Sequence, residues 1–585
     1  MKKIIYLCLA LATVMCSGCS DFLDEQKPQG TLDDEQVKDP LYVDNLVISA
    51  YAVWISAEDI NSSFSMWNFD VRSDDAYKGG NGIGDGDVFH QLEISQGILT
   101  TNWNINDMWQ RLYNGISRVN TAIALLNQTD ATAYPLKAQR LGEMKFLRAY
   151  GHFLLKRLYK NIPFIMNENL STEEYNTLSN TEYTNDEGWQ LIIDDLEEAY
   201  NVLPVKQEDK GRPSKAAAAA FLTKVYLYKA YHQDDAQTNE VTSISADDLK
   251  KVIEYSDPSI YSAGGFDLEA DYHNNFRPEP QYENGVESIW AMQYSMNDGT
   301  TYGNLNWSYG LIVPNIPGVT DGGCDFYKPS QNLVNAFRTD NNGLPYLDGT
   351  FNDVDVTEDY AGTIDPRLDF TVGRIGYPWR GHTYTAGWCR AYDTYGEFSN
   401  KKGWPAPEEA QASWPWGCSA LNYMFVRYAD ILLLKAEALI ELASGTNAAT
   451  DEGLVEARTL INQVRQRAAD SVDGRYTPQD LNPAKADYYV GLYPDDYDGN
   501  LAWTKDRARM ALRMERRLEL ALEGNRWFDL MRWGDDYLLN TVNTYMTQES
   551  ELRPYYSGRS ISSDEIFLPV PLAEIDNSNG LYKQY

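Results

Sequence analysis

Apolar side chains recur every three or four residues through two long parts of this chain, and this period constrains the fold more than any other feature. Segment 107–126 shows it at Met108, Leu112, Ile116, Val119, Ile123 and Leu126. The period returns in segments 41–55, 136–159, 186–202, 214–231, 423–442, 452–467 and 504–523. It puts apolar side chains on one face of a helix, and short links favour antiparallel neighbours. The pattern predicts a mostly α protein with a tetratricopeptide-like helix-pair scaffold over about 41–255 and 420–540, with an irregular helical bundle as the alternative.

Residues 256–416 lack this period. The stretch is rich in Gly, Pro, Asn, Asp and aromatic residues, and a second stretch of the same kind covers 64–103. Loops this long in a compact protein are usually functional. The chain has 41 Tyr and 15 Trp against 18 Phe, an excess of rings that carry a polar atom. We expect the two stretches to form a loop-rich, aromatic-rich ligand face within a single domain, 41–585.

Acidic residues outnumber basic ones by 85 to 50, which gives a net charge of −35. Such a surface repels phosphate backbones and anionic lipid head groups. The composition therefore argues against nucleic acid as a partner and against electrostatic binding to a membrane. Any membrane contact must come through a separate anchor.

The first residues predict such an anchor. Two lysines precede an eleven-residue apolar stretch, 4–14, which suits a signal peptide and is too short to span a bilayer. The small residues Ser17 and Gly18 precede Cys19, as lipoprotein signal peptidase requires, whereas the bulky Met15 precedes Cys16. We predict a signal peptide at 1–18, a lipid on Cys19 and a polar tether at 19–40. An ordinary secretory signal is the alternative, and no other apolar run approaches transmembrane length.

The motifs of common enzymes are missing. The sequence has no HExxH, GxSxG or P-loop, and no two of its five histidines are spaced as metal ligands on one helix. Asp85-Gly86-Asp87 offers two carboxylates for Ca²⁺, but further ligands at calcium spacing are missing. We therefore predict no catalytic residue, no cofactor and no metal ligand, with weak Ca²⁺ binding left open.

Several loop residues have the chemistry that holds a sugar. A sugar ring stacks its C–H face on Trp or Tyr, and its vicinal hydroxyls pair with Asp, Asn or Arg. The alternative for each ring is a place in the core, and for the acids a turn or helix cap. The predicted glycan-binding residues are Trp67, Asp74, Asp75, Tyr77, Asp85, Trp103, Trp307, Tyr309, Cys324, Trp388 and Arg390.

Three cysteines follow Cys19, and an odd number cannot all pair. Cys389 and Cys418 flank one loop, so a disulfide between them is open. Cys324 is left as a thiol in the loop region.

Four stretches together resemble the SusD family of surface glycan-binding lipoproteins. The strongest is ERRLELALEGNRWFDLMRWG at 515–534, and the others are KFLRAYGHFLLKRLYKNIP at 145–163, RYADILLLKAEA at 427–438 and FLPVPLAEI at 567–575. With the segment around Cys19, the resemblance covers nearly the whole chain. It departs at the tail, where the family often has Asn-Pro and this chain has Asn577-Ser578-Asn579.

The resemblance implies a partner and a location. Family members pair with a SusC-like TonB-dependent transporter, over which they close as a lid after capturing a glycan. The acidic residues after Cys19 resemble the export signal of Bacteroidetes surface lipoproteins. The resemblance therefore implies a lipid-anchored protein on the outer face of the outer membrane, among other glycan-binding lipoproteins and glycoside hydrolases. The charge of the chain favours a neutral oligosaccharide or polysaccharide as its ligand.

The C-terminal motif itself has a structural interpretation. Arg516, Arg517 and Arg526 can pair with acids of the same motif, and Arg516 and Glu519 are expected on the solvent side of their helix. We expect helix 504–523 to be remote from the ligand. Two other functions stay open: a surface glycoside hydrolase that uses two loop carboxylates, and a peptide-binding relative.

Overall fold

The computed structural model describes residues 40–55, 67–235, 238–295, 299, 304–317, 320, 323–403, 420–445, 447, 451–472, 481–494 and 502–584. The predicted signal peptide, Cys19 and the tether lie outside the described residues, as does Cys418. The side chains of Trp67 and Trp307 also lie outside them.

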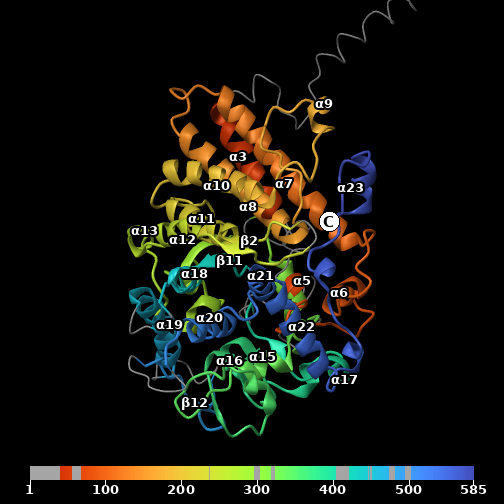
Figure 1. The fold of residues 1–585 in the computed structure, drawn as a ribbon, viewed down its shortest axis with the longest axis vertical. Coiled ribbons are helices and arrows are strands. Elements are labelled where there is room, and N and C mark those ends of the chain that lie inside the picture. Colours follow the sequence, from red (N-terminus) through yellow and green to blue (C-terminus); the bar gives the residue numbers. More distant parts are fainter. Residues whose placement is uncertain are drawn as a thin grey trace, which may run out of the picture.

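Among the described residues, nine helices pack side by side and form a curved stack, which runs from the top of the view in Figure 1 down its left side. They are α3 (Pro40–Ile55), α7 (Trp103–Gln128), α8 (Lys137–Tyr159), α10 (Asn185–Val202), α11 (Lys215–Ala230), α12 (Ala246–Tyr255), α18 (Tyr428–Leu442), α19 (Glu452–Asp470) and α20 (Lys505–Glu519). Successive members of this list are in contact. The predicted mostly α, tetratricopeptide-like scaffold is confirmed.

Small residues set the close approach of these helices. A Cβ on Gly142 of α8 would lie 2.4 Å from Val202 at the end of α10, and one on Gly115 of α7 would lie 2.6 Å from the Trp54 ring of α3. The alanine run of α11 is buried on all sides, as residues 216–220 are at most 1% exposed. Glycine and alanine therefore determine where the scaffold is most tightly packed.

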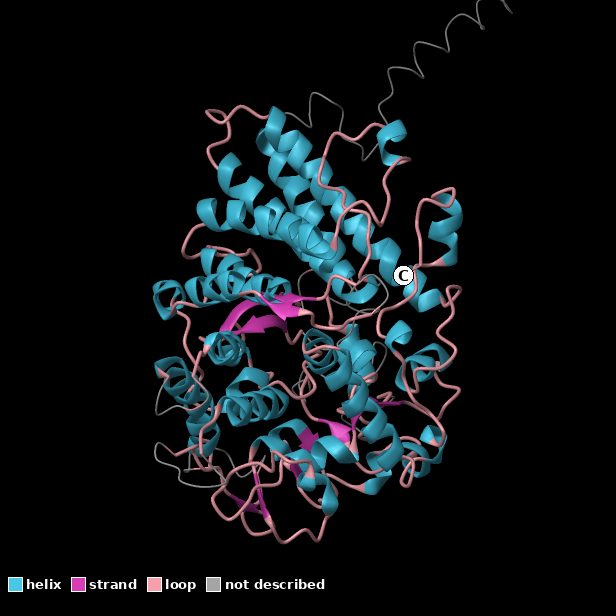
Figure 2. Cartoon of the chain, in the orientation of Figure 1, coloured by secondary structure: helices cyan, strands magenta, loops and turns pink. Residues whose placement is uncertain are grey.

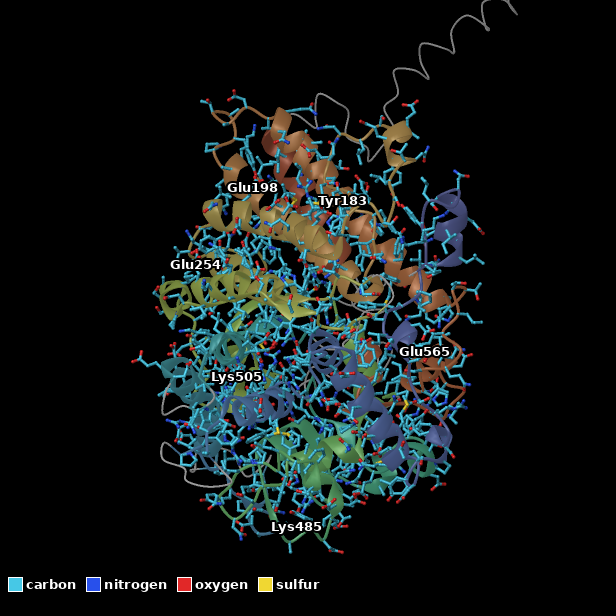
Figure 3. All side chains as sticks on the ribbon, in the orientation of Figure 1. Tyr183, Glu198, Glu254, Lys485, Lys505 and Glu565 are labelled. Carbon is cyan, nitrogen blue, oxygen red and sulfur yellow. The ribbon has the colours of Figure 1, made fainter. Side chains whose placement is uncertain are left out.

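Part of the acidic charge lies on the outside of this stack. Figure 3 labels Glu198 on α10 and Glu254 on α12 along one flank, and Glu565 on the opposite side of the molecule. Both helix residues are exposed. On both helices the exposed acid shares the helix with buried apolar residues, as expected for an amphipathic helix.

The other half of the molecule consists of loops, short helices and two-stranded ladders (Figure 2). The helices described here between residues 265 and 420 have six residues or fewer: α14 (Trp307–Ile312), α15 (Gln331–Ala336), α16 (Arg367–Thr371) and α17 (Tyr392–Tyr395). Strand β4 (Ser288–Met292) pairs with β11 (Tyr423–Arg427), which leads into α18.

One ladder joins the two aromatic-rich loop stretches. Strand β1 (Ala76–Gly79) is antiparallel to β5 (Phe326–Pro329), with Tyr77 opposite Lys328 and Gly79 opposite Phe326. Helices α5 (Trp67–Asp70) and α6 (Asp87–Glu93) flank β1 in the chain. Residues 64–103 and the centre of 256–416 therefore meet in space, although about 250 residues separate the two strands.

The C-terminal part of the chain returns to the N-terminal helices. After α21 (Arg526–Arg532) and α22 (Asp535–Glu549), the backbone N–H of Leu568 donates to the carbonyl of Leu158, and α23 (Leu572–Asn577) lies beside α7 (Figure 1). The Arg72 side chain donates to the carbonyl of Ile566 at 2.9 Å. Among the described residues, no helix is both long enough and apolar enough to cross a membrane.

Candidate ligand-binding face

The charged residues of the C-terminal motif lie in the protein interior. Glu519 accepts hydrogen bonds from Arg367, Arg427 and Arg467, and all four side chains are at most 5% exposed. Burial raises the pKa of Glu519, but the three guanidinium groups outweigh it and hold the pKa well below its usual range. The expectation that Arg516 and Glu519 face solvent is wrong, since both are buried.

The motif pairs mainly with distant parts of the chain. Arg526 binds both oxygens of Asp74 at 2.8 and 2.9 Å, and Arg517 donates to Asp75 at 2.7 Å. Within the motif, Asp529 holds ion pairs with Arg516 at 2.7 Å and with Arg532 at 2.8 Å. The motif therefore attaches the loop after α5 to the end of α20 and to the start of α21.

These pairs overturn two of the predicted glycan-binding residues. Asp74 is 3% exposed and Asp75 is 1% exposed, so neither reaches a ligand at the surface. Burial raises the pKa of Asp74, but Arg517 and Arg526 outweigh it and bring the pKa to about 2. Both acids serve the interior because each has a guanidinium partner that a sugar would have to displace.

Tyr77 is a third correction. Its ring is fully buried in β1, its hydroxyl donates to Glu549, and the same hydroxyl accepts the backbone N–H of Gln331 at 3.0 Å. Burial raises the pKa of Glu549 to about 7, against opposing effects of Tyr77 and Arg553. The Tyr77 ring is therefore part of the core beneath the loops.

Tyr309 is also buried, at 8% exposure in α14. Its ring lies under Gly403, where a Cβ would come within 2.5 Å of it. It lines a small cavity of about 20 Å³ with Phe276 and Lys402. This prediction is corrected in the same way, because the ring has no open face for a sugar.

The loop that follows β1 does reach the surface. Gly79 and Gly80 have positive φ, and a Cβ on Gly80 would lie 2.5 Å from the Phe326 ring and 2.9 Å from Asp85. Beneath the loop, the buried Lys78 ammonium donates to the carbonyls of Gly82 and Asp85. Asp85 is half-buried and accepts the backbone N–H of Asn81 at 2.7 Å.

Trp103 lies beside this loop and is the most exposed described tryptophan. It starts α7, is 57% exposed, and meets the half-buried Phe89 edge to face at 6.1 Å. A Cβ on Gly86 would lie 2.9 Å from Phe89 and 3.7 Å from the Phe326 ring. Trp103, Phe89 and Phe326 therefore follow one another across the edge of the loop.

Arg390 interacts with Cys324 and its neighbours, and Asp85 is near enough to act on the Cys324 thiol. The Arg390 backbone N–H donates to Asp325 at 2.9 Å, and its guanidinium lies 3.4 Å from the carbonyl of Gly323. Burial raises the pKa of the Cys324 thiol, Arg390 opposes this rise and Asp85 adds to it. Arg390 and Cys324 are both half-buried.

Trp388 stands next to Arg390 on a small aromatic base. It contacts Tyr384 edge to face at 5.5 Å and His382 at 6.3 Å, and Trp379 lies below it at 6.5 Å. Tyr384 and Trp379 are fully buried, whereas Trp388 is half-buried and His382 is exposed. The base holds the Trp388 ring at the surface without covering it.

We call residues 80–89, 103, 323–326 and 382–392 the ligand face. It holds five of the predicted residues, Asp85, Trp103, Cys324, Trp388 and Arg390. The sequence interpretation missed Phe89, His382 and Tyr392, which is 43% exposed. Phe89 lies in α6, which is too short to show an apolar period. The only sequence signal for its role is the Gly-rich segment directly before this helix.

Two cavities among the described residues lie away from this face. One of about 250 Å³ is lined by residues 205–214, Gly264–Phe266 and β4, and one of about 160 Å³ is lined mainly by apolar side chains, including Trp54, Leu147, Met292 and Phe425. Neither includes a predicted site residue.

Cys389 is a free thiol, and its Sγ donates to the carbonyl of Glu397 at 3.3 Å. Its possible disulfide partner, Cys418, lies outside the described residues. Within the part of the chain that the structure describes, Asp85 and Asp87 belong to no group of three metal ligands; the one such group is Asp186, His232 and Asp234.

The stack of helix pairs with a ladder-joined loop face defines a helical-scaffold binding protein. The model described as the SusD family matches residues 286–585, slightly more than half of the chain, and a second model, described as starch-binding and associating with the outer membrane, matches 21–227. The chain therefore belongs to the SusD family. Members of this family bind and do not catalyse, which agrees with the missing enzyme motifs.

The chain is similar to proteins of Bacteroidetes along almost its whole length. It is 26% identical over 554 residues to SusD-like protein P2 of Formosa agariphila. This match covers 91% of this chain and 90% of that protein. A SusD-like protein of Bacteroides fragilis has the same fold, with a TM-score of 0.67, 19% identity and coverage of 94% and 98%. Surface glycan-binding protein A of Bacteroides thetaiotaomicron, solved with laminarihexaose, also has this fold. Its TM-score is 0.63 at 20% identity, and the match covers 93% of this chain and 99% of that protein.

Proposed function

We propose that this chain is a surface-exposed lipoprotein that captures a neutral oligosaccharide on the ligand face. It delivers the glycan to a SusC-like TonB-dependent transporter in the outer membrane, to which Cys19 anchors it through a lipid. Other surface glycan-binding lipoproteins and glycoside hydrolases act beside it. The observation that carries the proposal is the ligand face itself, where exposed or half-exposed rings stand beside a guanidinium and a carboxylate.

The chemistry of the face suits a sugar. The Trp103 and Trp388 rings offer flat apolar surfaces for the C–H faces of a pyranose. Asp85 and Arg390 are half-buried and belong to two different loops of the ligand face. They offer an acceptor and a donor fork for vicinal hydroxyls. A glycan that spans the face would contact both loop stretches that the β1–β5 ladder joins.

The relatives support a glycan over a peptide. Surface glycan-binding protein A, which has the same fold, was solved with laminarihexaose. Another structure with a TM-score of 0.63 is described as a laminarin-binding SusD-like protein. Because these relatives are about 20% identical, they support the class of ligand and leave its linkage to experiment.

Calorimetry against a panel of neutral glycans tests the proposal. Trp103→Ala, Trp388→Ala and Arg390→Ala should each weaken the best glycan by roughly five- to a hundredfold, because a stacked ring or a charge-assisted hydrogen bond contributes about 1–3 kcal/mol. Tyr175→Ala is the matched control, since Tyr175 is 47% exposed on α9 (Thr172–Tyr175), outside the ligand face. If all three variants bind like the parent, the ligand face is wrong.

The same panel separates the alternatives. A hydrolase would release reducing ends during prolonged incubation, and a peptide-binding relative would respond to peptides and not to glycans. Both results contradict the proposal.

Anchor and partner have their own tests. Cys19→Ala should move the protein from the membrane fraction to the soluble fraction. The native protein should co-purify from mild detergent with a much larger TonB-dependent transporter. Membrane retention of the variant, with acyl label still incorporated, or recovery only as a lone monomer would count against these parts.

A further inference from the structure

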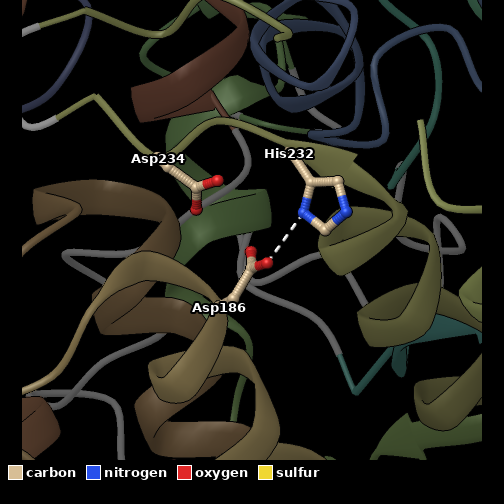
Figure 4. Close-up of side chains that lie close together, drawn as sticks. All are labelled: Asp186, His232 and Asp234. Carbon is tan, nitrogen blue, oxygen red and sulfur yellow. Dashed lines mark ion pairs between the residues drawn. The ribbon is translucent and has the colours of Figure 1, made fainter. Parts of the chain in front are cut away.

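Three side chains with metal-binding atoms converge on the scaffold, away from the ligand face. They are Asp186, His232 and Asp234, and their ligand atoms all lie within 4.8 Å of one another (Figure 4). His232 Nδ1 is 2.7 Å from an oxygen of Asp186. Asp186 belongs to the first turn of α10, His232 ends strand β2 (Tyr231–His232), and Asp234 follows two residues later.

The first two groups are held by rigid elements. Thr184 and Glu187 form a reciprocal capping box at the start of α10, which fixes the backbone around Asp186. His232 pairs with Ser243 of strand β3 (Ser243–Ile244), and its carbonyl accepts the N–H of Thr242 at 2.9 Å. Asp234 is exposed and can adjust.

One converging atom, Asp186 Oδ1, lacks any partner among the described residues, and a second, His232 Nδ1, has only its ion pair with Asp186. His232 Nδ1 and Asp186 Oδ1 are both shielded from solvent, and neither has a hydrogen bond within the described protein. Nδ1 forms a 2.7 Å ion pair with the other oxygen of Asp186, which leaves Oδ1 of the same carboxylate without a partner. Buried polar atoms are nearly always satisfied, so an ion that accepts electron pairs from both would account for them.

We propose that Asp186, His232 and Asp234 bind one divalent first-row transition ion per chain, of which Zn²⁺ is the type. An imidazole and two carboxylates suit such ions, whereas Ca²⁺ and Mg²⁺ take oxygen ligands almost alone. With bonds of about 2.0–2.1 Å, neighbouring tetrahedral ligands stand about 3.3 Å apart. His232 Nδ1 and Asp186 must therefore separate slightly, and Asp234 must move inward. The fourth position is left to water.

Nearby lysines set an upper limit on the affinity. The Lys156 ammonium donates to Asn185 at 2.9 Å, next to Asp186 in α10. Burial lowers the pKa of Lys156 to about 7, and the nearby Lys160 charge adds to this effect. The carboxylates of Asp186 and Asp234 oppose it. A dication must share these two carboxylates with the ammonium. We therefore expect micromolar binding and not the much tighter binding of structural zinc sites.

Zinc titration of the tag-free chain by calorimetry tests the site, with Ca²⁺ and Mg²⁺ as comparison ions. We expect one Zn²⁺ per chain and no comparable response to Ca²⁺ or Mg²⁺. Cobalt should give visible d–d absorption with a nitrogen and oxygen ligand set. The absence of saturable zinc binding below about 100 µM would overturn the proposal.

Substitutions locate the ion. Asp234→Asn and His232→Gln should each weaken zinc at least tenfold, and the exposed position of Asp234 keeps its variant folded. Asp247→Asn on α12 is the matched control, since the Asp247 side chain is 92% exposed and should leave binding unchanged. Equal zinc affinity of the parent and both site variants would place the ion elsewhere and contradict the proposal.

Discussion

Arginine and acidic residues meet in two parts of this molecule under opposite conditions. Around Glu519, three guanidinium groups and their acids are buried and satisfy one another. On the ligand face, Arg390 is half-buried, and its guanidinium makes one long contact with a backbone carbonyl besides its interaction with Cys324. Arginine and acidic residues therefore stabilise the interior where their hydrogen bonds are satisfied by other protein groups. They are suited to ligand recognition where some of their donors and acceptors have no protein partner.

Substitutions in these two parts should have different effects on the free energy of unfolding. Removing one partner of a buried ion pair costs about 3–5 kcal/mol, because the other charge stays buried and unpaired, whereas exposed pairs contribute about 0–1 kcal/mol. Substitutions in the interior should thus change stability and leave ligand affinity alone. Substitutions on the ligand face should do the reverse.

The largest effect is expected from Glu519→Ala. It leaves Arg367, Arg427 and Arg467 without their shared acceptor, so stability should fall by about 3–5 kcal/mol, or the protein should fail to fold. Thermal unfolding followed by circular dichroism measures the loss. Glu254→Ala, at an exposed position of α12, is the control and should stay within about 0.5 kcal/mol. A Glu519 variant as stable as this control would remove the basis of the comparison.

Glu549→Gln adds a pH dependence to the interior. Burial raises the pKa of Glu549 from 4.5 to about 7, so between these values the folded state keeps a proton that the unfolded state releases. The parent therefore loses stability from this group as the pH rises from 4.5 to 7, by up to about 3 kcal/mol, and nothing further above pH 7. Gln cannot ionise and lacks this loss.

The stability difference between Glu549→Gln and the parent should therefore grow in favour of the variant from pH 5 to pH 7 and then level off. Denaturant unfolding at a series of pH values measures it, with Glu551→Gln, an exposed neighbour, as control. A difference that stays flat with pH, or that shrinks, would show that the carboxyl is ionised in the folded protein throughout.

Asp75→Asn sharpens the boundary between the two parts. Asp75 accepts from Arg517, so its loss should cost about 1–3 kcal/mol of stability. The folded fraction should bind glycan as the parent does, since the side chain is 1% exposed. Calorimetry and unfolding on the same sample decide the matter: reduced affinity at unchanged stability would return Asp75 to the binding site.

The smallest effect is expected where the two parts meet. Lys78→Met removes the ammonium that holds the carbonyls of Gly82 and Asp85, while the methionine keeps the buried hydrocarbon. We expect a stability change within about 1 kcal/mol and a two- to tenfold loss of glycan affinity as the loop loosens. Lys250→Met, at an exposed position of α12, is the control. An unchanged affinity would mean that the loop contributes little to recognition.

The helices were predictable because their apolar period is local. Segment 107–126 appears as Trp103–Gln128, and segment 504–523 as Lys505–Glu519 followed by a turn. Burial of the loop acids was not predictable, because Asp74 and Asp75 find their arginines 452 and 442 residues later in the chain. A single sequence does not reveal such pairings, so these acids had the same appearance as Asp85.

The same limit explains the errors within the motif. The spacing of Arg516 and Glu519 fits an exposed pair on one helix, but each faces a different element of the interior. Likewise, Asp186 lies 46 residues before His232, and only the packing of α10 against the β2 hairpin brings them together. Local spacing predicts which residues share one face of a helix. It does not predict which element of the fold packs against that face.

The attachment of Asp74 to Arg526 and of Arg72 to Ile566 also has a consequence for how the protein folds. These contacts close loops of more than 450 residues, and closing such loops costs entropy before the contacts repay it. The segment after α5 can reach its final place only when almost the entire polypeptide is present. Completion of the ligand face is therefore a late event in folding, and a nascent or truncated chain would hold a helical stack whose recognition surface has not yet formed.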